Sequence, residues 1–247
     1  MPKKQSETTE AKFFTNAEFW VAQMATLGGV YKPPNPHAAL AVLQANLAAA
    51  LPLRTAFQQK SSIEEETRNS RETLHQPTSK LMTDLIKYCD SAGWDKNDLD
   101  NLRSFSREYK GRRAVPKQPA DPNNPNGGGQ TISSAQTSYA GKTEHFANFV
   151  ETLRANAVNF NPSETKFLLT TLDATLAAKR QANTDVTNAT AETDTARTAL
   201  DAPLYTTADN LCDGLNSAIK YLGSAFRDHQ VYHNVKKLKF KKPKRLL

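Results

Sequence analysis

The sequence predicts an all-α protein made by tandem duplication of a helical unit: a pseudo-twofold helical bundle with long antiparallel helices. Three observations lead to this prediction. Glycine accounts for only 10 of 247 residues, apolar residues recur at helical spacing, and the two halves of the chain match when one is shifted onto the other. Ala and Leu are abundant and β-branched alternation is weak, so helix is favoured over sheet.

The duplication is visible in residues that align at a constant shift, a sign of internal repetition. A shift of 129 positions (20 to 149) aligns Trp20, Met24, Tyr31, Pro33, Leu43 and Leu47 with Phe149, Leu153, Phe160, Pro162, Leu172 and Leu176. A shift of 133 positions (86 to 219) aligns Ile86, Lys87 and Tyr88 with Ile219, Lys220 and Tyr221. The aromatic pairs, the proline and the Ile-Lys-Tyr triplet make shared helical composition an insufficient explanation.

These matches divide the chain into five segments. We expect a disordered N-terminus at 1–12, a first helical repeat at 13–113 and a second at 143–235. Between the repeats, 114–142 is rich in proline and glycine, a composition typical of a flexible linker. A basic C-terminal tail follows at 236–247.

Each repeat is expected to begin with a short helix, which Thr15 would cap with Glu18 at capping-box spacing. A proline-containing turn leads to a long helix, and Pro77 and Pro203 lie near its far end, where a bend is expected. In the second repeat the long helix has alternating spacings of four and three, typical of a packing seam. The seam residues are Leu172, Leu176, Lys179, Asn183, Val186, Thr190, Thr193, Arg197, Leu200 and Leu204.

The middle of this long helix is poor in large apolar residues. Between Ala177 and Ala199 the only one is Val186. Such helices either pack closely through small residues or project into solvent as a polar hairpin. The composition favours a loosely packed bundle end.

The excess positive charge is concentrated at the end of the chain. The formal net charge is +7, from 32 Lys and Arg against 25 Asp and Glu. Seven of the cations lie in the last twelve residues, so the remainder has 32 − 7 = 25 basic residues and is neutral. A basic tail is a weaker indication of nucleic-acid binding than a generally basic surface.

Both repeats end in cations, and these cations, together with Phe240, are the candidate contacts for an anion or a nucleic acid. They are Lys236, Lys237, Lys239, Phe240, Lys241, Lys242, Lys244, Arg245, Arg112 and Arg113. Phe240 could stack on a base while the lysines bind phosphates. Alternatively, the tail could lie on an anionic lipid surface, or Leu238 and Phe240 could dock on the bundle with the lysines outward. Alignment with Phe105 favours Leu238 as part of the last helix.

Catalytic chemistry is not indicated. No nucleophile, base and orienting group can be nominated together, and no cofactor motif or zinc spacing is found, so we expect no enzyme, cofactor or metal. His229 and His233, four residues apart, are expected to be solvated. Cys89 and Cys212 are expected to be free thiols of a reducing compartment, and localisation to be cytoplasmic. The most apolar run, Ala38 to Leu53, is shorter than a bilayer span and predicts a core helix rather than a transmembrane segment.

The sequence therefore favours a non-catalytic helical scaffold, a structural or interaction protein that presents two related surfaces to an unidentified protein partner. The alternative is a nucleic-acid-associated protein, or one bound to an anionic surface, anchored through its basic tail.

Overall fold

The computed structural model describes residues 5–112 and 138–242, which form helices and connecting turns without any strand. The first half contains α1 (Gln5–Ala25), the short turns η1 (Gly28–Val30) and η2 (Pro36–Ala38), α2 (Leu40–His75), α3 (Thr78–Ser91) and α4 (Lys96–Tyr109). The second half contains α5 (Tyr139–Ala155), η3 (Thr165–Phe167), α6 (Leu169–Asp201), the π-helical turn η4 (Ala202–Thr206), α7 (Leu211–Ala225) and α8 (Gln230–Val235).

The chain divides into two compact units. Unit 1 takes residues 1–62 and 191–247, and unit 2 takes residues 63–190. The boundaries cut through the two long helices, so that α2 and α6 each contribute to both units. As a result, each unit draws on both halves of the chain.

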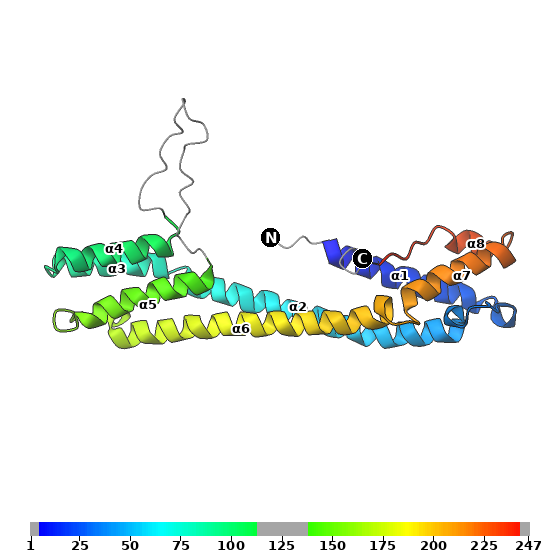
Figure 1. Cartoon of the computed structure of the whole chain (residues 1–247), viewed down its shortest axis with the longest axis horizontal. Helices are drawn as coiled ribbons and strands as arrows, with labels where there is room; N and C mark the ends of the chain where they lie inside the picture. The colour runs from blue at the N-terminus through cyan, green and yellow to red at the C-terminus, as the bar shows by residue number, and fades with distance from the viewer. Residues whose placement is uncertain (1–4, 113–137, 243–247) are drawn as a thin grey trace, which may run out of the picture. The chain divides into compact units, whose positions relative to one another are not determined.

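In unit 1, α1, the first part of α2, the end of α6, α7 and α8 enclose one apolar core (Figure 1). The buried residues recur every three or four positions, the spacing of one helical face. On α1 and α7 they are Phe13, Phe14, Ala17, Trp20, Met24, Leu211, Cys212, Leu215, Ala218 and Leu222. The short helix α8 packs against α1 and α7 through Val231 and Val235.

In unit 2, α4 packs along α5 and against α3 (Figure 1). The core is built from the same kind of helical faces: Met82, Leu85, Cys89, Leu99, Leu102, Tyr109, Phe146, Phe149, Val150, Leu153, Leu172 and Leu176. Glycines end α3 and α4. Gly93 (φ 74°) and Gly111 (φ 67°) have the left-handed conformation that a side chain disfavours, and each turns the chain after its helix.

Within each unit the long helices touch through side chains. In unit 1, Lys60 Nζ lies 2.6 Å from a Glu192 carboxylate oxygen. In unit 2, Thr190 Oγ1 donates to a Glu64 carboxylate oxygen at 3.0 Å, and Lys179 Nζ donates to the Leu74 carbonyl at 2.8 Å. In unit 2, the contact closer to the end of α2 is also closer to the start of α6, so the two segments run antiparallel there.

Several sequence expectations about the helix boundaries need correction. Helix α1 begins at Gln5, so 5–12 is helical rather than disordered, and Thr15 lies inside the helix instead of capping it. Helix α8 ends at Val235, so Leu238 packs on the core from outside the helix. The long helices do end close to Pro77 and Pro203, as expected.

The middle of α6 also differs from the expected loosely packed bundle end. Helix α6 is continuous, and Val186, Ala189 and Thr193 in its middle are buried. Small and polar side chains at spacings of three and four therefore form the packed face. The alternative of close packing through small residues describes this segment.

One helical stretch of the described chain, Leu40–Ser91, is long and apolar enough by length and composition alone to cross a membrane, and 22% of its apolar window is buried. The buried part of this window includes Leu43, Leu47 and Ala50, which belong to the core of unit 1.

Candidate functional site

A groove between α3 and α4 of unit 2 gathers positive charge. It has a volume of about 400 Å³ and is lined by Thr83, Ile86, Lys87, Arg103, Ser106, Arg107, Lys110 and Arg112. Five of these eight residues are cations and none is a carboxylic acid. We call this the α3–α4 groove.

The local sequence explains why these side chains meet. Arg103 and Arg107 of α4 and its C-cap residue Lys110 are spaced by four and three, so they share a helical face. Gly111 then turns the chain. The Gly111 amide donates to the Glu108 carbonyl at 2.9 Å and the Arg112 amide donates to the Arg107 carbonyl at 3.0 Å, the hydrogen bonds of a Schellman motif. This turn allows Arg112 to line the groove.

The cations of the groove are held by neighbouring polar groups. Lys110 Nζ donates to Thr83 Oγ1 at 2.9 Å, and an Arg107 guanidinium nitrogen donates to Ser104 Oγ at 2.9 Å. Arg107 Nε is buried and has no hydrogen-bond partner among the described residues. Burial, and then the charge of Arg112, lowers the pKa of Lys110. Positive charge in this groove is therefore partly desolvated and self-repelling.

In the part of the chain that the structure describes, Arg103 alone among the lining cations forms ion pairs with acids. It lies 3.1 Å from Asp100 and 3.7 Å from Asp90. Within the described residues, Lys87, Lys110 and Arg112 form no ion pair.

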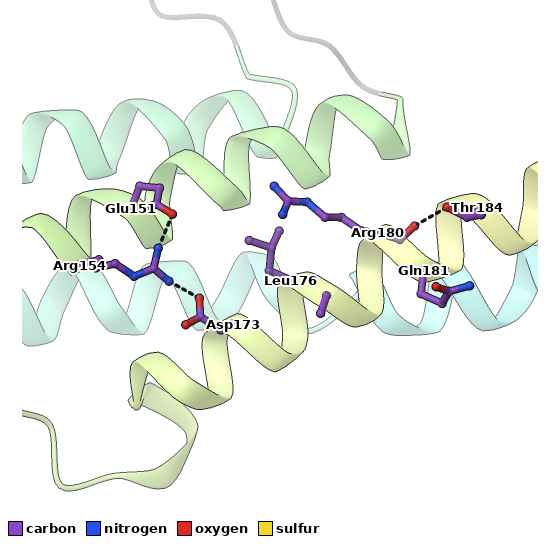
Figure 2. A pocket seen from close by; sticks show the side chains of 8 residues that line it. Glu151, Arg154, Asp173, Leu176, Arg180, Gln181 and Thr184 are labelled. Atoms are coloured by element: carbon purple, nitrogen blue, oxygen red, sulfur yellow. Dashed lines mark hydrogen bonds and ion pairs between the residues drawn. The ribbon is translucent and has the colours of Figure 1, made fainter.

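A second groove lies between α5 and α6 of unit 2 and has a volume of about 470 Å³. Figure 2 shows Arg154 of α5 between Glu151 and Asp173, and both carboxylates pair with it. Hydrogen bonds to Glu151 and Asp173 raise the pKa of Arg154. Farther along, Arg180 and Thr184 line the same groove on α6. Because its ion pairs are internal, this groove offers less unbalanced charge than the α3–α4 groove.

A buried polar cluster lies where α2 ends in unit 2. Lys179 is fully buried, and burial, followed by the charge of Lys142, lowers its pKa to about 8. His75 is 5% exposed, and burial together with nearby cations lowers its pKa to about 4. His75 Nδ1 lies 2.9 Å from the Tyr109 hydroxyl, which donates to the His75 carbonyl at 3.1 Å. We interpret this cluster as structural, because Lys179 and Tyr109 donate hydrogen bonds to the last two carbonyls of α2.

The candidate residues of the tail belong to unit 1, and Phe240 is not presented to solvent. Its ring is 4% exposed, with its centroid 5.3 Å from that of Phe13 in an edge-to-face contact. The Asn216 side-chain amide donates to the Phe240 carbonyl at 2.9 Å. To stack on a base, this ring would have to leave the core of unit 1.

The lysines around Phe240 differ in their surroundings. Lys236, Lys237, Lys239 and Lys241 are exposed. Lys242 is half-buried and pairs with Asp213 at 2.7 Å, and this hydrogen bond is the main reason for the lowered pKa of Asp213. Lys244, Arg245 and Arg113 lie outside the described residues. This arrangement corresponds to the alternative in which the tail docks and its lysines face outward.

The sequence identified Arg112 but missed Lys87 and Arg103. The spacing of Arg103, Arg107 and Lys110 predicts a common face on α4, and this signal was available. The contribution of Lys87 could not be predicted from the sequence, because it depends on how α3 packs against α4.

Among the described residues, no group of three or more His, Cys, Asp or Glu side chains could hold a metal ion, and both cysteines are free and buried. Comparison of the chain with protein families, with curated proteins and with solved structures gives no match.

Proposed function

We propose that this chain is a non-catalytic helical scaffold built from two copies of one unit, and that it presents two related surfaces to a partner. In this proposal the copies exchange parts. Unit 1 combines α1 and the start of α2 with the end of α6, α7 and α8. Unit 2 combines α5 and the start of α6 with the end of α2, α3 and α4. Each unit would then contain the opening part of one copy and the closing part of the other.

The observation that carries this proposal is an aromatic contact found in both units. In unit 1 the rings of Tyr31 and Tyr221 have centroids 5.6 Å apart. In unit 2 the rings of Phe160 and Tyr88 have centroids 5.8 Å apart. Under the two sequence shifts, Tyr31 corresponds to Phe160 and Tyr221 to Tyr88. Residues that correspond under the two shifts therefore form the same kind of contact in each unit, which supports the proposal.

Element boundaries support the same proposal. The turns η2 (Pro36–Ala38) and η3 (Thr165–Phe167) start 129 residues apart, and so do α2 and α6 (169 − 40 = 129). Helix α1 packs with α8, and α5 packs with α4, which are the corresponding pairs. Corresponding residues are also buried in both units. Examples are the pairs Trp20 and Phe149, Leu43 and Leu172, and Leu102 and Val235.

The two related surfaces would be the α3–α4 face of unit 2 and the α7–α8 face of unit 1. The matched cations are Lys87 with Lys220 and Arg103 with Lys236, and all four are exposed. Exposed charges at corresponding positions would give both faces a similar electrostatic character, which favours partners of the same kind.

The test is quantitative capture of proteins from the native host on the immobilised full chain. One variant carries Lys87→Glu and Arg103→Glu, a second carries Lys220→Glu and Lys236→Glu, and a third carries all four. We expect one partner to be captured at about half the normal amount by either double variant and to be lost from the quadruple variant. Different partners lost from the two double variants, or no loss from the quadruple variant, would refute two related surfaces.

A second candidate, nucleic-acid binding through the tail, is favoured by one observation: Lys236, Lys237, Lys239 and Lys241 are exposed around a ring that is held in the core. Deleting the tail would also remove Phe240 from that core, so neutralising these four lysines to Gln is the cleaner test. If the candidate is correct, the variant keeps its thermal stability and loses salt-sensitive binding to a DNA or RNA oligonucleotide. Unchanged binding, or no binding by the parent chain, excludes it.

A further inference from the structure

We propose that the α3–α4 groove binds a small, multiply phosphorylated anion through Lys87, Arg103, Arg107, Lys110 and Arg112. The inference concerns one of the two faces described above but does not depend on duplication or on a protein partner. It follows from the charge, construction and donor set of the groove.

Five of the eight residues that line the groove are cations. Like charges that share a partly desolvated hollow repel one another. The lowered pKa of Lys110, caused by burial and by Arg112, is consistent with this repulsion. An anion bound between these side chains would remove it.

Helix stabilisation alone does not account for this set of cations. Cations at the C-terminus of a helix interact favourably with the helix dipole, which explains Arg107 in the last turn of α4 and Lys110 at its C-cap. It does not explain why Lys87, on α3, faces the same hollow. Two elements therefore supply the charge, as expected for a site that surrounds a ligand.

The groove is also held in shape. Thr83 fixes the ammonium of Lys110, Ser104 fixes the guanidinium of Arg107, and the turn at Gly111 directs the chain so that Arg112 lines the groove. The Arg107 Nε–H is buried without a partner among the described residues, and a buried donor of this kind is costly unless a ligand or water accepts from it. Positioning of this kind reduces the entropy lost on binding.

The hydrogen-bond donors that line the groove are of the kinds that bind phosphate. Arginine guanidinium groups bind phosphate oxygens through two parallel hydrogen bonds, lysine adds point charges, and the Ser106 and Thr83 hydroxyls lie in the lining. None of the eight lining residues is aromatic, so the groove has no surface on which a base would stack. Its volume, about 400 Å³, is in the range of small-molecule sites. A compact anion such as pyrophosphate or tripolyphosphate fits these features better than a nucleic acid.

The experiment is isothermal titration calorimetry of the full chain with pyrophosphate, tripolyphosphate and, for comparison, sulfate. The groove variant carries Lys87→Gln, Arg103→Gln and Arg112→Gln, three exposed residues whose replacement should preserve the fold. The matched control carries Lys12→Gln, Lys32→Gln and Arg227→Gln, which changes the net charge equally on exposed residues of unit 1. We expect the groove variant to bind tripolyphosphate at least about tenfold more weakly than the parent chain and the control to bind within about twofold of it.

Three outcomes would overturn the proposal. The parent chain does not bind either phosphate compound, sulfate binds as tightly as they do, or the control loses as much affinity as the groove variant. A parallel arm uses phosphatidylcholine vesicles with about one-fifth phosphatidic acid. Groove-dependent binding to these vesicles without binding of the soluble anions would also overturn it, in favour of a lipid surface. Partner capture by the Lys87 and Lys220 faces is measured separately, so either proposal can fail alone.

Discussion

The buried Lys179 has a structural reason at the end of α2. The last carbonyls of a helix lack partners within the helix, and Pro77, which follows α2, has no amide hydrogen to offer. Lys179 Nζ donates to the Leu74 carbonyl, and the Tyr109 hydroxyl donates to the next carbonyl, that of His75. A cation at a helix C-terminus is also favoured by the helix dipole. Ala50 aligns with Lys179 in the first half, and it is equally buried without any capping role.

This burial predicts how stability depends on pH. The pKa of Lys179 falls from 10.5 to about 8 on folding, so the unfolded chain binds more protons between these values and stability rises with pH across them. The difference, 10.5 − 8 = 2.5, corresponds to up to about 3 kcal/mol. Relative to Lys179→Met, the free energy of unfolding of the parent chain should increase by up to about this amount between pH 7.5 and 10.5. Urea unfolding at several pH values measures it.

The control for this prediction is Lys80→Met, the same substitution at an exposed lysine of unit 2. If both variants change with pH in parallel, burial of Lys179 is not the cause and the interpretation of the cluster is wrong.

At the scale of the elements, sequence spacing predicted the packed face of α6 well. Of the ten seam residues, seven are buried and the other three, Asn183, Thr190 and Arg197, are half-buried. The 3–4 spacing fixes a helical face regardless of residue type, which is why the seam was right even where it contained Lys179 and Thr193. It does not specify what that face contacts. The contact of Tyr31 with Tyr221, far apart in sequence, could not be predicted from spacing.

The candidate site was predicted less completely for the same reason. Arg112 was identified because consecutive cations close the first half, whereas Lys87 joins the groove only through the packing of α3 on α4. Phe240 was proposed to stack on a base because its lysine neighbours dominate the local composition. Its burial depends on Phe13, at the other end of the chain.

The close packing of α7 against η2 gives a second prediction. A Cβ atom at Gly214 would lie 2.7 Å from the His37 carbonyl oxygen and 2.7 Å from a methyl group of Leu43. Because the first neighbour is backbone and cannot turn aside, Gly214→Ala should destabilise unit 1 by about 1–3 kcal/mol. Chemical denaturation followed by circular dichroism measures the change.

Gly223→Ala on the same helix is the matched control. There the nearest atoms, 3.2 Å away or more, belong to the side chain of Tyr232, which can move. Alanine also has a higher helix propensity than glycine, so this variant should be neutral or slightly more stable. Equal destabilisation by the two substitutions would contradict the tight approach at Gly214.

At the scale of the whole molecule, the main feature is that each unit is built from helices of both halves of the chain. Residues 5–112 supply α1 to α4 and residues 138–242 supply α5 to α8, yet each unit needs helices from both segments. If the two segments separated, each core would lose the enclosing helices that the other segment supplies. Tyr88, for instance, contacts Phe160 and Phe167 across the two segments. The stability of either segment should therefore depend on the presence of the other.

A protease site inserted between 113 and 137 tests this dependence. After cleavage, we expect the two fragments to co-elute in gel filtration at the position of the uncut 27.3 kDa chain and to unfold in one common transition. Each fragment expressed alone should have much less helix, because single amphipathic helices gain most of their stability from tertiary packing. Mixing the separate fragments should restore the helical signal, since the contacts that hold each unit lie between the fragments and require no peptide bond. Two fragments that elute separately and remain folded would mean that each half of the chain is a domain in its own right, and the exchange of parts between the copies would have to be abandoned.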